Sequence, residues 1–141
     1  MRIGAFTLMV AAAASFAAEH PRPAFILIVN PTNHVSKIDR KFLAEVFLRR
    51  ATRWPDDTPV QPVDLGPDAP ARVRFTQEIL SRSVTSVRSY WQQRIFSGQG
   101  LPPPELVNDE AVVSYVAAHP GAVGYVSAGT PLNGAMVLEL N

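Results

Sequence analysis

The chain of 141 residues contains no cysteine, so disulfides, thiol nucleophiles and thiolate metal ligands are excluded. Its three histidines, His20, His34 and His119, do not stand at a spacing typical of metal ligands. Ser127 in GYVSAG lies one position too late for the nucleophile elbow of α/β-hydrolases. Because no nucleophile can be paired with a base and an orienting residue, the sequence predicts a protein that is not an enzyme, with no catalytic residue, metal site or cofactor.

The sequence also lacks an excess of charge of one sign. It has 13 basic and 12 acidic side chains, and removal of Arg2 with a signal peptide would leave 12 of each. Proteins that bind nucleic acid or anionic membranes non-specifically carry a basic excess. We therefore expect no nucleic-acid partner, and any anion site has to be local.

Long apolar runs are missing except at the N-terminus, where residues 3–16 carry no charge. Arg2 precedes this run and small residues at 15 and 17 follow it, a pattern typical of a secretory signal peptide. The run is shorter than the ~20 residues that a membrane-spanning helix needs. The sequence thus predicts a signal peptide at 1–17 and one domain at 18–141 that is periplasmic or secreted and does not span a membrane.

Thirteen prolines separate apolar segments whose patterns alternate between strand and helix. Strands are predicted at 24–30, 60–65, 105–107, 122–126 and 134–140, and helices at about 36–50, 69–81, 83–96 and 108–118. Ser36 with Asp39, Ser83 and Asn108 are expected to cap helices. The helix at 83–96 is expected to turn four residues inward, namely Val84, Val87, Trp91 and Ile95. This order predicts an α/β domain with a mixed, mostly parallel sheet flanked by helices.

The segment VDLGPDAPARVRF at 63–75 joins a predicted strand to a predicted helix. A helix N-terminus carries unpaired N–H groups and about half a positive charge, which together attract anions. Arg72 in the first turn can add a guanidinium group to such a site. Alternatively, Asp68 caps the helix and occupies the anion position itself. Asp64 serves either the ligand or only the turn.

Other candidate positions have two interpretations each. Asn30 and Thr32 follow the first strand at its carboxyl end, where α/β sheets bind ligands, or they only make hydrogen bonds typical of turns. SGQG at 97–100 is neither a Walker loop nor a dinucleotide-binding loop, and we interpret it as a flexible loop that would border any ligand or partner site. The larger aromatic residues are expected to pack in the core and at its rim, namely Trp54, Tyr90, Trp91 and Tyr125.

Several landmarks follow one another along residues 25–127. The most specific is PGAVGYV at 120–126, and the others are the apolar strand ending at Asn30, Val46-Phe47 with Trp54 after a short gap, the strand–turn–helix reaching Phe75, Tyr90-Trp91, Phe96-Ser97-Gly98 and Pro102-Pro103. In this order they resemble the type II periplasmic binding-protein family, and within it the phosphate-binding components of ABC transporters. The resemblance implies the fold of a single lobe of such a protein, with a small oxyanion held at the start of the 69–81 helix.

Two differences from the family pattern bear on function. Full-length members have two lobes that close on the ligand, and this chain is long enough for about one. Where phosphate binders carry a Ser-Gly-Thr-like stretch, this chain has DAPA at 68–71, which lacks the hydroxyl groups, and Pro70 has no backbone donor.

The resemblance leads to two hypotheses. In the first, an exported solute-binding-like protein weakly binds phosphate or a similar oxyanion, Asp64 accepts a proton from it, and a second copy or an envelope protein supplies the opposite wall. The candidate ligand-binding residues are Asp64, Asp68, Ala69, Arg72, Asn30 and Thr32. In the second, the domain is an interaction or accessory module of an envelope complex that kept the lobe fold and lost ligand binding.

Overall fold

The computed structural model describes residue 12 and residues 23–141, so the predicted signal peptide lies outside the described residues apart from Ala12. The helices are α1 (Arg40–Phe47), α2 (Pro70–Leu80), α3 (Val84–Phe96) and α4 (Asp109–Ala118). The strands are β1 (Phe25–Val29), β2 (Lys37–Ile38), β3 (Gln61–Pro62), β4 (Asp64–Leu65), β5 (Glu105–Leu106), β6 (Ala122–Ser127), β7 (Met136–Val137) and β8 (Glu139–Leu140). All these elements lie within residues 18–141. None of the helices formed by residues 23–141 has the length and apolar character needed to cross a membrane.

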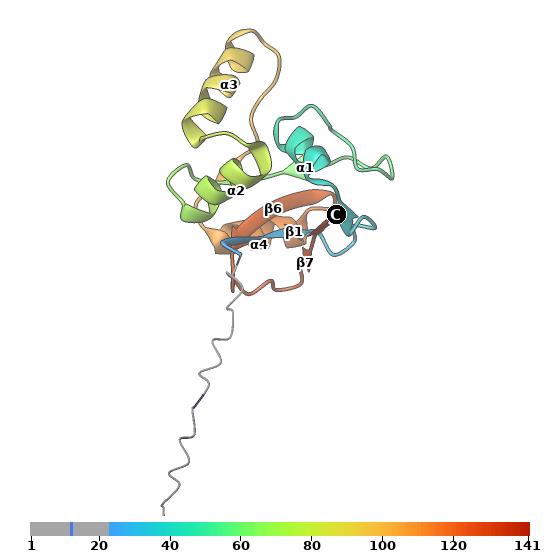
Figure 1. The fold of residues 1–141 in the computed structure, drawn as a ribbon. Helices are drawn as coiled ribbons and strands as arrows, with labels where there is room; N and C mark the ends of the chain where they lie inside the picture. The colour runs from blue at the N-terminus through green and yellow to red at the C-terminus, as the bar shows by residue number, and fades with distance from the viewer. Residues whose placement is uncertain (1–11, 13–22) are drawn as a thin grey trace, which may run out of the picture.

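The central sheet has four strands in the order β3-β6-β1-β7 (Figure 1). β1 pairs antiparallel with β6 and with β7, whereas β3 pairs parallel with β6. Two short parallel ladders, β2-β8 and β4-β5, lie outside it. The mixed α/β fold is confirmed, but parallel pairs do not predominate in the central sheet. Alternation of strands and helices predicts the relative direction only of strands that follow one another in the chain. Because all four helices lie between β1 and β6 in the sequence, the pattern does not fix the direction in which these two strands pair.

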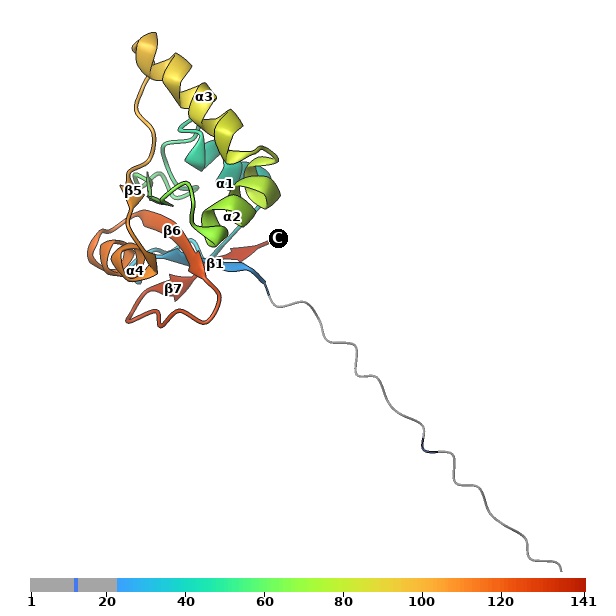
Figure 2. The ribbon, with the colours of Figure 1, turned by 90° about the vertical axis from the view of Figure 1, so that its left-hand side faces the viewer.

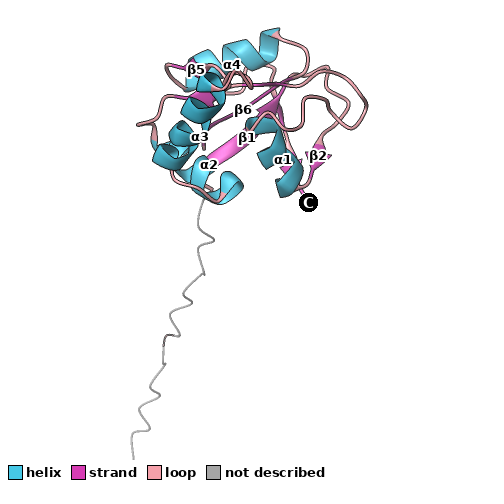
Figure 3. Cartoon of the chain, turned by 90° about the horizontal axis from the view of Figure 1, so that it is seen from above, coloured by secondary structure: helices cyan, strands magenta, loops and turns pink. Residues whose placement is uncertain are grey.

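Helices cover both faces of this sheet (Figures 1 and 3). On one face the Tyr125 ring of β6 stacks on Phe75 of α2 at 3.9 Å between centroids, and Phe47 of α1 packs against Phe75 at 4.6 Å. On the other face, a Cβ atom at Gly124 would lie 2.8 Å from Val112 of α4. Glycine is therefore required at this position for α4 to approach the sheet closely.

The helix starts differ in part from the sequence prediction. Ser83 and Asn108 cap α3 and α4 as expected, with side chains that accept from the Ser86 and Ala111 amides. α1 is capped by Asp39 and not by Ser36, because residues 37–38 form β2 and the helix begins only at Arg40.

The start of α2 has no side-chain cap, so the predicted cap by Asp68 is wrong. Pro70 occupies the first turn and Ala69 is the N-cap residue, which places Asp68 one position too early. The Asp68 side chain is exposed.

Two predicted strands are each divided in two. Residues 60–65 form β3 and β4, which pair with β6 and β5, and residues 134–140 form β7 and β8. Leu138 separates the latter two because its side chain is buried and its amide donates to Leu27. β3 with Pro62 lies at the edge of the central sheet, as expected.

Helix α3 projects from the body of the domain (Figures 1 and 2). Its buried residues are Val87 and Trp91. Ile95, predicted to face inward, is 49% exposed, because its end of α3 lies farthest from the sheet (Figure 2).

Candidate functional site

A buried polar cluster lies where β4 leads into α2. Asp64 is 7% exposed and Arg72 3%. The Tyr125 hydroxyl donates to Asp64 Oδ1 at 2.7 Å and accepts from the Leu65 amide at 3.2 Å. Arg72 Nε lies 3.7 Å from the same Asp64 oxygen. The structure therefore brings together two of the predicted site residues, Asp64 and Arg72, and adds Tyr125, which the sequence analysis assigned only to packing.

Burial dominates the electrostatics of this cluster. Desolvation raises the pKa of Asp64 to about 6, against the opposing effects of the Arg72 charge and the Tyr125 hydrogen bond. The same burial, together with the Asp64 charge, raises the pKa of Tyr125, which stays protonated as a donor. Asp64 consequently changes charge in mildly acidic solution, beside a permanent cation.

Arg72 has further partners within the protein. Its Nη1 donates to the Leu65 carbonyl at 2.7 Å and lies 3.6 Å from Glu105 Oε1 on β5. Two carboxylates thus face one guanidinium group. Asp64 and Arg72 also line an open hollow of about 180 Å³ between β4, β5 and α3, whose other walls are Arg88, Trp91, Gln92, Ile95, Pro102, Pro103 and Glu105. Arg88 and Gln92 were missed by the sequence analysis, since only the packing of α3 turns them toward Arg72.

The start of α2 leaves backbone donors without partners. Ala69 makes no side-chain cap, Pro70 has no N–H, and within the described residues no backbone partner is found for the amides of Ala71 and Arg72. The side chain that was expected to fill this place, Asp68, is turned to solvent. Of the predicted site residues, Asp64, Asp68, Ala69 and Arg72 therefore lie on one connection.

Asn30 and Thr32 lie elsewhere. β1 runs antiparallel to β6, so Asn30 follows β1 beside the start of β6, where its amide donates to the Ala122 carbonyl. The Asn30 side chain donates to the Val116 and Ala117 carbonyls at the end of α4 and accepts from Thr32. The turn interpretation describes the bonds between Thr32 and Asn30. The bonds from Asn30 to α4 are tertiary contacts that it did not include, and the structure does not bring Asn30 and Thr32 to the Asp64–Arg72 cluster.

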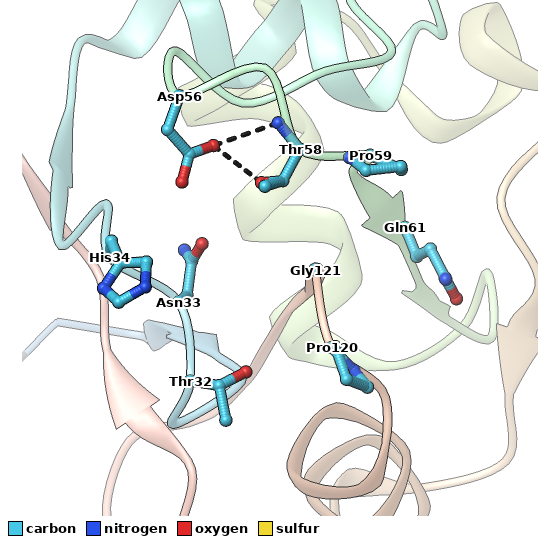
Figure 4. Close-up of a pocket in the computed structure, with 9 residues that line it drawn as sticks. All are labelled: Thr32, Asn33, His34, Asp56, Thr58, Pro59, Gln61, Pro120 and Gly121. Carbon is cyan, nitrogen blue, oxygen red and sulfur yellow. Dashed lines mark hydrogen bonds between the residues drawn. The ribbon is translucent and has the colours of Figure 1, made fainter.

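A second hollow, of about 420 Å³, opens beside Thr32 (Figure 4). Its polar lining comes from two loops, with His34 and Asn33 facing Asp56 and Thr58 (Figure 4). Asp56 accepts from the amide and hydroxyl of Thr58, and these bonds lower its pKa. Of the predicted site residues, Thr32 lines this hollow, and Pro120 and Gly121 of PGAVGYV lie on its wall. The sequence analysis did not connect them with Asp56 and Thr58, which lie more than 20 residues from Thr32 in the chain. Within residues 23–141, no three side chains of His, Asp or Glu gather as a metal site.

Comparison with solved structures places the fold. The chain is similar to an ABC-type phosphate transport receptor from Vibrio cholerae, with 17% identity and a TM-score of 0.65 over 83% of this chain and 46% of that one. It is also similar to a putative phosphate ABC transporter substrate-binding protein with bound phosphate from Clostridium perfringens (16%, TM-score 0.62, covering 83% and 44%). PstS from Borrelia burgdorferi matches at 16% identity and a TM-score of 0.63, covering 84% and 47%. The chain thus spans under half the length of these proteins.

Among curated proteins, none matches the chain significantly. The family model for the PBP superfamily domain matches residues 21–138, which include every element from β1 to β7. Fold and sequence therefore agree with the family resemblance of PGAVGYV and the landmarks before it. The chain belongs to the PBP superfamily domain family and has the α/β fold of about half of a phosphate-binding protein.

Proposed function

We propose that this chain is an exported binding lobe that holds a small oxyanion weakly in the hollow between β4, β5 and α3, which Arg72 of α2 also lines. The observation that carries the proposal is the pair Asp64–Arg72, 3.7 Å apart, on the wall of that hollow. Arg72 and Arg88 supply positive charge, and Gln92 supplies a neutral donor. The unpartnered amides at the start of α2 add the positive end of the helix dipole.

Weak binding follows from the same contacts. Asp64 and Glu105 already offset the charge of Arg72, so an incoming anion gains less from it. Protonation of Asp64 removes one of these negative charges, and with a pKa of about 6 this happens in mild acid. Asp64 accepts the proton that makes room for the ligand charge, and we expect anion affinity to rise as the pH falls through about 6.

Sulfate is the better probe of this site, because its charge stays constant over the pH range that titrates Asp64. For residues 18–141 at about pH 5, a millimolar Kd and ~10 mM sulfate would raise the unfolding free energy by about 1.4 kcal/mol. The rise should be smaller at neutral pH and should be lost in Arg88→Gln. Arg53→Gln, in the exposed turn after α1, should keep it and reports the general effect of sulfate on stability. Equal responses from both variants would refute the site.

Export is a separate part of the proposal. It is supported by the N-terminal pattern and is tested by N-terminal sequencing of the protein recovered from its native host. A mature chain that begins at Ala18 is expected, and an intact Met1 in the folded protein would contradict it.

A second candidate function is an accessory or interaction module without a ligand. It is favoured by the full engagement of Arg72, whose side chain is buried and bonded to Leu65 beside two carboxylates. The two candidates separate in the sulfate experiment, since the module predicts no response that depends on Arg88.

A further inference from the structure

The arm formed by the turn 81–83, α3 and the loop 97–104 differs in composition from the rest of the chain. No acidic residue occurs between Glu78 and Glu105, whereas Arg82, Arg88 and Arg94 fall in this stretch. Within the described residues, none of these three arginines makes an ion pair, unlike Arg72 and Arg74. A chain with nearly balanced charge therefore has one strongly basic projection.

Three guanidinium groups gather around one aromatic ring on this arm. Those of Arg50, Arg82 and Arg94 lie 5.6, 5.3 and 5.2 Å from the centroid of Tyr90. A carboxylate lies near only one of them in the described structure, where Glu45 is 3.9 Å from Arg50. Arg94 Nε is also buried without a hydrogen-bond partner among these residues. Like charges held this close repel one another unless an anion offsets them.

Apolar side chains are exposed at the end of α3 and in the loop that follows it. Phe96 is 96% exposed and Leu101 70%. Phe96 lines a shallow hollow of about 420 Å³ together with Tyr90 and Arg94, so the exposed ring adjoins the arginine cluster. The end of α3 is also the part of the arm farthest from the sheet (Figures 1 and 2).

We propose that this arm docks on an anionic phospholipid surface, with Phe96 and Leu101 entering the interface and Arg82 and Arg94 facing lipid phosphates. Apolar side chains at a projecting end can enter a lipid layer, while arginines behind them contact the headgroups. Each basic side chain near such a surface strengthens binding about fivefold. A second copy of the chain is a poor partner, because two basic arms would repel each other.

The position of Phe96 favours a headgroup layer over the flat face of an acidic protein. Phe96 is 96% exposed at the projecting end of α3, and Arg82 and Arg94 lie behind it beside Tyr90. A headgroup layer surrounds an inserted end on all sides. This site uses residues other than the hollow beside Arg72, and its test is independent of oxyanion binding there.

Co-sedimentation with vesicles tests the proposal, using residues 18–141 to exclude the apolar N-terminal run. Binding to phosphatidylcholine vesicles with ~30% phosphatidylglycerol should exceed binding to pure phosphatidylcholine at least tenfold. Arg82→Gln with Arg94→Gln should weaken it about 25-fold, and Phe96→Ser about tenfold. Matched controls are Lys37→Gln with Arg53→Gln, and Val137→Ser on β7, which should leave binding within about twofold.

Absence of binding that depends on phosphatidylglycerol would overturn the proposal, as would equal losses in the arm variants and the controls. Retention on poly-L-glutamate without vesicle binding would assign the arm to an acidic protein instead. If inorganic phosphate stabilised the chain against unfolding in a salt-dependent way and vesicles did not bind, the arm would be assigned to a small anion. Circular dichroism of each variant shows that loss of binding is not loss of fold.

Discussion

The starts of α2 and α4 differ in how their first backbone amides are capped. α4 is closed by Asn108, which accepts from the Ala111 amide, and Asp109 and Glu110 stand in its first turn. α2 has no side-chain cap and no acidic residue in its first turn, and Arg72 is buried there instead. The start of α4 satisfies one of its amides with its own cap, whereas the first amides of α2 have no partner within the described residues. The positive end of α4 is already offset by its own acidic side chains, whereas that of α2 is not, and this is why the proposed oxyanion site lies beside α2.

The largest expected effect comes from removing the cation at the start of α2. Arg72→Ala leaves the Asp64 carboxylate buried and unpaired, and should cost about 3–5 kcal/mol of unfolding free energy. Arg74→Ala, two residues along the same helix, removes only an exposed pair with Glu78 and should cost less than about 1 kcal/mol. Urea unfolding of both variants measures the difference. Similar losses would mean that Arg72 contributes no more than a surface residue.

A smaller change in the unfolding free energy is expected when the pH is varied. Burial raises the pKa of Asp64 from 3.8 to about 6, so the folded protein binds a proton that the unfolded chain releases. Stability from this group is complete below about pH 4 and is lost as the pH rises through about 6, on the order of 2–3 kcal/mol in total. Unfolding at a series of pH values should show this fall in the wild type but not in Asp64→Asn. A stability that rises between pH 4 and pH 6 by the same amount in both proteins would contradict the assignment to Asp64.

The smallest changes in stability are expected from substitutions beside the two helix starts. Asn108→Ala should cost about 1 kcal/mol, because the Ala111 amide loses its acceptor. Asp68→Ala, next to α2, should change stability by less than about 0.5 kcal/mol, because its side chain makes no cap. Thermal unfolding of both variants is sufficient. If Asp68→Ala proved as costly as Asn108→Ala, the start of α2 would be capped in solution and closed to anions.

The sequence predicted local features of the fold correctly where one segment contains all the necessary information. The strand 24–30 and the caps by Ser83 and Asn108 follow from patterns within a few residues. The cap at α2 was predicted wrongly because Pro70, by occupying the first helical turn, made Ala69 the N-cap residue. Asp64 and Arg72 were identified, but Arg88 and Gln92 reach the same hollow only through the packing of α3.

By itself, the sequence determined the absence of thiol chemistry, the α/β class and the family, because each depends on composition or on short ordered patterns. Tertiary structure alone decided the antiparallel pairing of β1 with β6 and the separation of Asn30 from Asp64. It also decided that α3 projects from the body and leaves Phe96 at its end 96% exposed. These features depend on contacts between segments far apart in the chain, and the free energy of such contacts is set by burial and charge in three dimensions, which a local pattern does not encode.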